Sequence, residues 1–199
     1  MATPMARLDL RKASILLLEP NAPNMAVVTQ VLLGFGARTF HRCETGEQAK
    51  ALVQETAVDL MIVEGQTAEG EPDGFDFVHW LRRSELEPTA YTPVIITSAH
   101  TSKRNVARAR DCGAHFIVAK PLAPVVLFER IIWVARVNRP FVNAGVYVGP
   151  DRRFKNLGPP AGADGRRVTD VKDEVGLAQE QDMSQTEIND LMQPAKVAL

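Results

Sequence analysis

The sequence has few cysteines, almost no net charge and no long apolar run. Cys43 and Cys112 are too few for a disulfide scaffold or a cysteine-rich zinc site. The formal net charge of −1 excludes a uniformly basic nucleic-acid coat and a polyacidic disordered chain. No apolar run reaches the ~20 residues of a membrane helix, and the basic N-terminal stretch has no signal cleavage site. We therefore expect a soluble, cytoplasmic protein without membrane insertion or nucleic-acid binding.

Hydrophobic residues make up 45% of the chain, enough for a substantial core, and their distribution changes near Pro140. The part before Pro140 is rich in aliphatic runs, whereas the part after it contains Gly-Pro and Ala-Gly turns that are typical of linkers. We expect an N-terminal arm over 1–12 and a folded domain over 13–140. A linker or extended tail over 141–182 and a short amphipathic helix over 183–192 follow.

Within the expected domain, short apolar runs alternate with stretches of helical spacing. The runs predict strands at 14–18, 37–41, 58–63, 93–97 and 115–119. The stretches between and after them predict helices at 24–35, 46–55, 75–83, 102–112 and 124–138. This alternation predicts an α/β fold with a doubly wound, five-stranded parallel sheet. Sites in such sheets lie beyond the carboxyl ends of the strands.

Four polar residues follow the predicted strands at that edge. Glu19 and Glu64 end the first and third strands, Ser98 ends the fourth, and Lys120 follows the fifth. Polar residues are common where strands meet water, but two carboxylates, a hydroxyl and an ammonium at one edge indicate a single polar site.

The chain resembles the receiver domain of two-component response regulators, the fold of the chemotaxis messenger. The resemblance covers about 13–138 and rests on five segments: 15–19, 59–64, 73–75, 93–99 and 113–122. It implies the flavodoxin-like order of strands. It also implies an acceptor of phosphate from a histidine kinase after the third strand, an acidic pair for Mg²⁺ after the first, and a Ser/Thr and a lysine that contact the phosphoryl group. Ser98 and Lys120 match the last two positions.

Two positions depart from that pattern. Glu64 stands at the acceptor position in place of aspartate, and Pro20 removes one carboxylate from the acidic pair that Glu19 retains. Mg²⁺ requires near-octahedral oxygen ligands, so we expect no cofactor and at most a weak residual Mg²⁺ site at Glu19 and Glu64. The longer Glu64 side chain also misplaces its oxygens, and an error of about 1 Å can cost roughly 100-fold in rate.

These departures predict a non-enzymatic, stand-alone pseudo-receiver that acts by protein–protein contact. Whether Glu64 imitates a phosphorylated aspartate or marks a decayed site stays open. If Glu64 reaches Lys120, pairing should lower the pKa of Glu64. Two other functions stay open: a response regulator that a kinase still phosphorylates, and a nucleotide-binding module that uses the arginine pairs 152–153 and 166–167.

The predicted helices at 102–112 and 124–138 supply a candidate partner surface. It combines three basic residues of the first helix with an apolar stripe of the second: Lys103, Arg104, Arg108, Val126, Trp133 and Val137. The resemblance implies that this side of a receiver carries the contacts with partners. We expect the partner to be another signalling or motility protein or a second copy of the chain.

The tail contains one segment with the pattern of a short helix. Ser184 and Glu187 form a capping box, and Ile188, Leu191 and Met192 lie on one face at helical spacing. The segment is similar to the N-terminal peptide of the flagellar switch protein FliM, which binds a receiver. An ordinary capped helix is the alternative. We expect it to dock on a surface made by the predicted helix at 102–112, the fifth strand and the predicted helix at 124–138, in its own chain or in another.

Overall fold

The computed structural model describes residues 9–66, 73–137, 139–152 and 182–192. Five strands form the central sheet: β1 (Ser14–Leu18), β2 (Thr39–Cys43), β3 (Leu60–Glu64), β4 (Val94–Ser98) and β5 (Phe116–Ala119). Five helices connect or follow them: α1 (Ala22–Gly34), α2 (Gly46–Glu55), α3 (Gly74–Arg83), α4 (Lys103–Asp111) and α5 (Pro124–Arg136). A 3₁₀ turn, η1 (Thr89–Tyr91), precedes β4.

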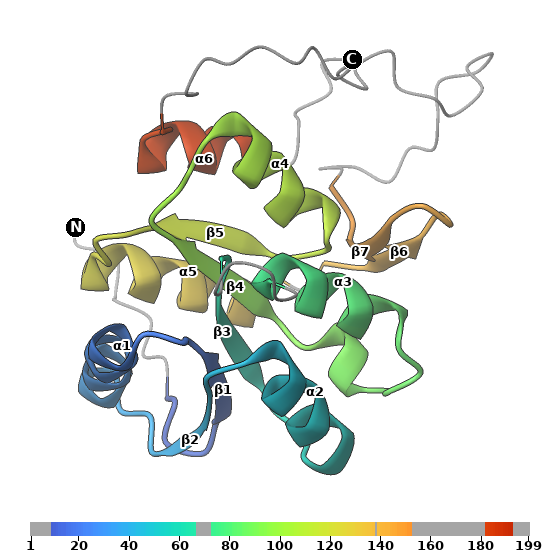
Figure 1. The fold of residues 1–199 in the computed structure, drawn as a ribbon. Coiled ribbons are helices and arrows are strands. Elements are labelled where there is room, and N and C mark those ends of the chain that lie inside the picture. The colour runs from blue at the N-terminus through green and yellow to red at the C-terminus, as the bar shows by residue number, and fades with distance from the viewer. Residues whose placement is uncertain (1–8, 67–72, 138, 153–181, 193–199) are drawn as a thin grey trace, which may run out of the picture.

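The sheet is parallel throughout, with the strand order β2-β1-β3-β4-β5. Helices α1 and α5 cover one face and α2, α3 and α4 cover the other (Figure 1). Because both faces are covered, β3 and β4 are buried along their whole length, as their aliphatic sequences require. The predicted doubly wound α/β fold is therefore confirmed.

The helices begin at side chains that satisfy their first backbone N–H groups. The side chain of Asn21 accepts a hydrogen bond from the backbone N–H of the third residue of α1. Thr45 caps α2 and Ser102 caps α4 in the same way. Asp73 and Asp76 form a reciprocal capping box at α3. These caps fix where each helix leaves the carboxyl edge of the sheet, which is the edge that carries the predicted site.

The second strand lies two residues later than predicted. Gly36 adopts a φ of 97°, and the N–H of Ala37 returns to the carbonyl of Leu32. These residues therefore complete the end of α1, and the strand begins only at Thr39. Ala37 is an apolar residue that is buried at the end of α1, and the sequence pattern therefore counted it as part of the strand.

A hairpin follows α5 where the sequence predicted an extended linker. Strands β6 (Phe141–Asn143) and β7 (Val148–Pro150) pair in antiparallel fashion. Gly149 and Pro150 are buried, and the Phe141 ring contacts the Tyr91 ring at 5.1 Å in an edge-to-face arrangement. The folded body thus extends past Pro140, and the boundary predicted there is wrong.

Buried Arg82 of α3 joins this hairpin to the body. Its Nε donates to the carbonyl of Gly113 at 3.0 Å, its Nη1 donates to the carbonyl of Ala90 at 2.6 Å, and its guanidinium lies over the Phe141 ring. Gly113 has a φ of 94°, and a Cβ there would lie 2.5 Å from the carbonyl oxygen of Val148. Close approach of two backbones therefore requires glycine at this position.

A last helix, α6 (Gln185–Met192), lies within the segment predicted at 183–192. It packs along β5 and α4 (Figure 1). No helix in the described ranges is long and apolar enough to span a membrane.

Candidate functional site

The carboxyl ends of the strands bring Glu19, Glu64 and Lys120 together. Lys120 Nζ donates to Glu19 Oε2 at 2.6 Å and forms a second ion pair with Glu64 Oε2. We call these three residues the ion-pair cluster. Their side chains are only 5%, 8% and 13% exposed for Glu19, Glu64 and Lys120 respectively, so water screens the pairs weakly. One ammonium is thus shared between two carboxylates.

Burial and neighbouring charges shift the pKa values of Glu64 and Lys120. Burial raises the pKa of the Glu64 carboxyl, and the hydrogen bond and charge of Lys120 offset only part of this effect. The expectation that pairing would lower the pKa of Glu64 is therefore wrong, although the contact itself is present. Burial opposes the charged form of Lys120, but its two carboxylate partners prevail and raise its pKa.

Ser98 lies next to the cluster but does not join it. Its hydroxyl donates to the carbonyl of His100 at 3.1 Å and accepts from the His100 N–H at 3.1 Å. The side chain is fully buried at the end of β4. In this arrangement Ser98 holds the loop after β4, and Lys120 reaches the carboxylates without it.

The carboxylate oxygens of the cluster do not fit a Mg²⁺ site. Glu19 Oε1 accepts from the N–H of Asn21 and Glu64 Oε1 accepts from the N–H of Gln66, while both Oε2 atoms face Lys120. Pro20 contributes no carboxylate. Among the residues that the structure describes, no group of three or more His, Cys, Asp or Glu side chains gathers around a possible ion. A cation would have to displace Lys120 from both partners.

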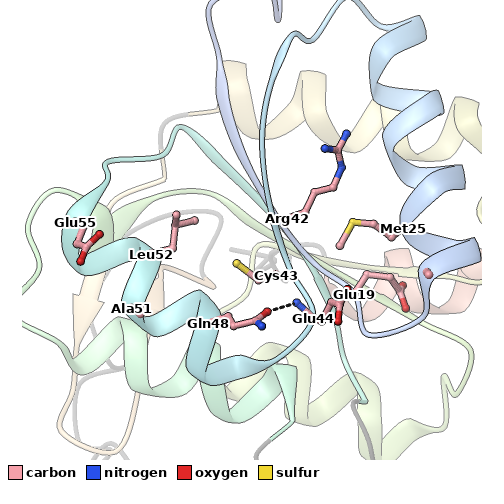
Figure 2. Close-up of a pocket in the computed structure, with 10 residues that line it drawn as sticks. Glu19, Met25, Arg42, Cys43, Glu44, Gln48, Ala51, Leu52 and Glu55 are labelled. Atoms are coloured by element: carbon pink, nitrogen blue, oxygen red, sulfur yellow. Dashed lines mark hydrogen bonds between the residues drawn. The ribbon is translucent and has the colours of Figure 1, made fainter.

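An open cavity of about 590 Å³ borders the cluster on the side of β2. Figure 2 shows Glu19 at one wall, Met25 of α1 at another, and the α2 residues Leu52 and Glu55 opposite. The Gln48 side chain accepts from the N–H of Glu44 at 2.7 Å across its rim. Glu19 thus belongs both to the cluster and to the cavity wall.

The predicted partner surface is divided in the structure. Lys103 and Arg104 are exposed on α4, but Arg108 pairs with Asp73 at 2.8 Å and lies over the Phe75 ring at 4.5 Å. Its charge is therefore already used inside the domain, between α4 and the start of α3. The Arg108 side chain is still 39% exposed, so its place on the partner surface stays a prediction.

The apolar stripe of α5 is also partly used within the chain. Trp133 packs edge-to-face on Phe116 at 4.7 Å, and the Arg139 guanidinium lies over the Trp133 ring at 5.4 Å. Val126 is half-buried, while Val137 is 40% exposed. The contact with Trp133 shows that Phe116 points to the face of the sheet that α5 covers.

Helix α6 carries the predicted cap. The N–H and hydroxyl of Ser184 donate to Glu187 Oε2 at 2.8 and 2.7 Å. Ile188 is fully buried and Met192 is 6% exposed, but Leu191 is 45% exposed. Met192, four positions after Ile188, is buried on the same face of the helix, whereas Leu191, three positions after Ile188, turns towards solvent. The expectation that Leu191 lies on the docking face is therefore wrong.

Sequence reasoning missed the two polar residues that hold α6. Thr101, in the loop after β4, and Gln185, in the first turn of α6, make hydrogen bonds across more than 60 positions of the chain. Thr101 belongs to no periodic pattern, and Gln185 lies in the predicted tail helix but outside its cap and its apolar face. The sequence offers no signal for such pairs, because their meaning depends on which loop faces which helix.

The family described as "Response regulator receiver domain" matches residues 15–132. No curated protein matches the chain.

Solved receiver structures share the fold. A CheY-like response regulator receiver domain protein from Methanospirillum hungatei has a TM-score of 0.53 and 19% identity, covering 61% of this chain and 92% of that one. Chemotaxis protein CheY4 of Vibrio cholerae has a TM-score of 0.55 and 22% identity, covering 61% and 98%. The receiver domain of a histidine kinase from Syntrophus aciditrophicus has a TM-score of 0.54 and 24% identity, covering 66% and 98%.

Proposed function

The chain belongs to the response regulator receiver family, and from this premise we propose that it is a stand-alone pseudo-receiver that signals by protein–protein contact. Glu64 stands in place of the phosphoacceptor aspartate that the family resemblance implies. The partner is another signalling or motility protein. The observation that carries the proposal is the buried ion pair between Glu64 and Lys120, because it occupies the lysine that would otherwise meet a phosphoryl group.

The same contact favours a permanent, phosphate-independent state over simple decay. Glu64 extends a negative charge to Lys120 without a phosphoryl group, and Glu19 supplies a second one. The function is therefore assigned to binding and not to phosphoryl transfer.

The nucleotide-binding alternative gains little support from the described residues. Arg152 donates to the carbonyl of Arg110 at 2.6 Å, pairs with Asp111 at 2.9 Å and lies over the Tyr147 ring. These contacts already engage its guanidinium. Arg153, Arg166 and Arg167 lie outside the described residues.

A phosphorylation assay with a repaired site tests the proposal. The full chain is incubated with acetyl phosphate and Mg²⁺, and its intact mass is measured. We expect no added phosphoryl mass for the wild type, since Glu64 misplaces the acceptor and Pro20 removes a carboxylate. The double variant Pro20→Asp with Glu64→Asp restores both groups and should gain one phosphoryl group.

The controls separate the remaining functions. If the wild type gains a phosphoryl group that Glu64→Gln removes, the chain is a response regulator that still accepts phosphate, and the pseudo-receiver proposal is wrong. The single variant Glu64→Asp tells whether the acceptor alone, without the second carboxylate, is enough.

A further inference from the structure

Strand β5 forms one edge of the sheet, and α6 supplies hydrogen bonds that another strand would make there. An edge strand carries backbone N–H and C=O groups that have no strand partner. Gln185 Oε1 accepts from the Ala119 N–H at 2.7 Å, and Gln185 Nε2 donates to the Ile117 carbonyl at 3.1 Å. A side-chain amide, with one acceptor and one donor, thus imitates a strand backbone.

A second set of contacts fixes the start of the tail helix to the loop after β4. The Thr101 N–H donates to Asp182 Oδ1 at 2.8 Å, and its hydroxyl donates to the Met183 carbonyl at 2.9 Å. The Met183 N–H in turn donates to the Thr101 carbonyl at 2.8 Å. Thr101 is buried, so these bonds are shielded from water.

Apolar burial completes the attachment. Ile188 and Met192 belong to the same core cluster as the strands, whereas Leu191 points outward and is 45% exposed. The helix spans only Gln185–Met192, and a helix of that length does not hold alone in water. Its existence therefore depends on the surface that it covers.

The two attachment points lie beside the ion-pair cluster. Ala119 directly precedes Lys120, and Thr101 follows Ser98 by three positions. The Lys120 N–H donates to the Ser98 carbonyl at 2.8 Å, which joins the two segments behind the cluster. A change in the ion pairs that Glu19 and Glu64 form with Lys120 therefore occurs one residue away from Ala119, whose backbone N–H binds Gln185.

From this geometry we propose that α6 is an internal cap on the β5 edge whose attachment is energetically coupled to the ion-pair cluster. The inference rests on the proposed function and names its regulation. In the wild type, both carboxylates hold Lys120 and thus the end of β5, and α6 stays docked over β5 and α4. Weakening that hold loosens α6 and opens this face to a partner. Such coupling is reciprocal, so loss of α6 also changes the cluster.

Amide hydrogen exchange of the full-length, isotope-labelled chain tests the attachment. The Ala119 N–H is the direct probe, because its acceptor is the Gln185 side chain. Ile188→Ala removes a buried anchor and should raise the Ala119 exchange rate roughly ten-fold or more. The matched variant Leu191→Ala shortens an exposed neighbour and should change it less than about three-fold. Amides of β1 serve as the check that the sheet remains folded.

Glu64→Gln tests the coupling. Lys120 then keeps one charged partner, so the Ala119 rate should rise roughly five-fold or more while the β1 amides remain protected. Glu55→Gln, an exposed glutamate on the far wall of the cavity, is the matched control and should leave the rate unchanged.

The outcomes are distinct. An unchanged Ala119 rate in Ile188→Ala overturns the cap. A raised rate in Ile188→Ala with an unchanged rate in Glu64→Gln overturns the coupling and leaves α6 as a purely structural element. Neither result depends on phosphorylation, so failure of the proposed function would be recognised separately by its mass measurement.

Discussion

Glu64 carries the electrostatic cost of the ion-pair cluster. Two buried carboxylates share one ammonium, so one negative charge remains without full compensation. The raised pKa of Glu64 means that the folded chain binds a proton there more tightly than the unfolded chain does. The stability gained from that proton is present at low pH and is lost as the pH rises through the folded pKa.

Glu64→Gln should therefore raise the free energy of unfolding near neutral pH, because glutamine carries no charge whose burial must be compensated. The gain should shrink as the pH falls towards the ordinary glutamate pKa of 4.5, since the wild-type carboxyl is then protonated as well. Urea unfolding at several pH values measures both effects. A variant that is less stable than the wild type at neutral pH would show that attraction to Lys120 outweighs burial.

At the scale of elements, the regular part of the fold follows from sequence patterns. All five sheet strands lie within two residues of the predicted bounds at each end. Strands β1, β3, β4 and β5 were found because their aliphatic runs are buried in the sheet, whereas β2 is displaced by two residues at both ends. The hairpin was not predicted, since Phe141–Asn143 and Val148–Pro150 are too short for a clear alternation. Its stability comes from Arg82 and Gly113, which lie 28 or more positions away in the chain.

In the candidate site, the positions of the residues follow from the sequence, but their contacts do not. The four residues at strand ends could be found from the sequence, because parallel strands end at one edge. The partners of each side chain could not. Arg108 turns to Asp73 and Ser98 turns to His100, and these choices depend on distances that appear only after the elements have packed.

Gly113→Ala should loosen the attachment of the hairpin. The added methyl would meet the Val148 carbonyl, and the left-handed backbone at this position disfavours alanine. We expect a loss of about 1–3 kcal/mol in the free energy of unfolding. Thermal unfolding followed by circular dichroism measures the loss. Gly145→Ala is a useful comparison, because that glycine also has a positive φ but has open space around its Cβ position.

At the scale of the whole molecule, a receiver body is closed on two sides by segments that follow α5. The hairpin covers the region around buried Arg82, and α6 covers β5 beside α4 (Figure 1). The chain therefore cannot be divided at Pro140 into a domain and an independent tail.

A comparison of two truncated chains checks this boundary. The chain 1–152 retains the hairpin, whereas the chain 1–140 removes it and exposes Arg82 and the buried His115. Both lack α6, so within the described residues they differ by 141–152, which is the hairpin together with Asp151 and Arg152. We expect 1–140 to melt at a temperature lower by several degrees. Equal melting temperatures would mean that the hairpin contributes nothing to the stability of the body.

A glutamine side chain lies at the edge of β5 and another just beyond the end of β2, the other outer strand of the sheet. Gln185 covers the edge of β5, and Gln48 accepts the Glu44 N–H just past the end of β2. Unprotected strand edges are templates on which molecules stack into insoluble aggregates. Loss of Gln185 would leave the Ile117 carbonyl and the Ala119 N–H available to a neighbouring molecule. The same amide that places α6 therefore also helps the protein to remain dispersed when it is concentrated.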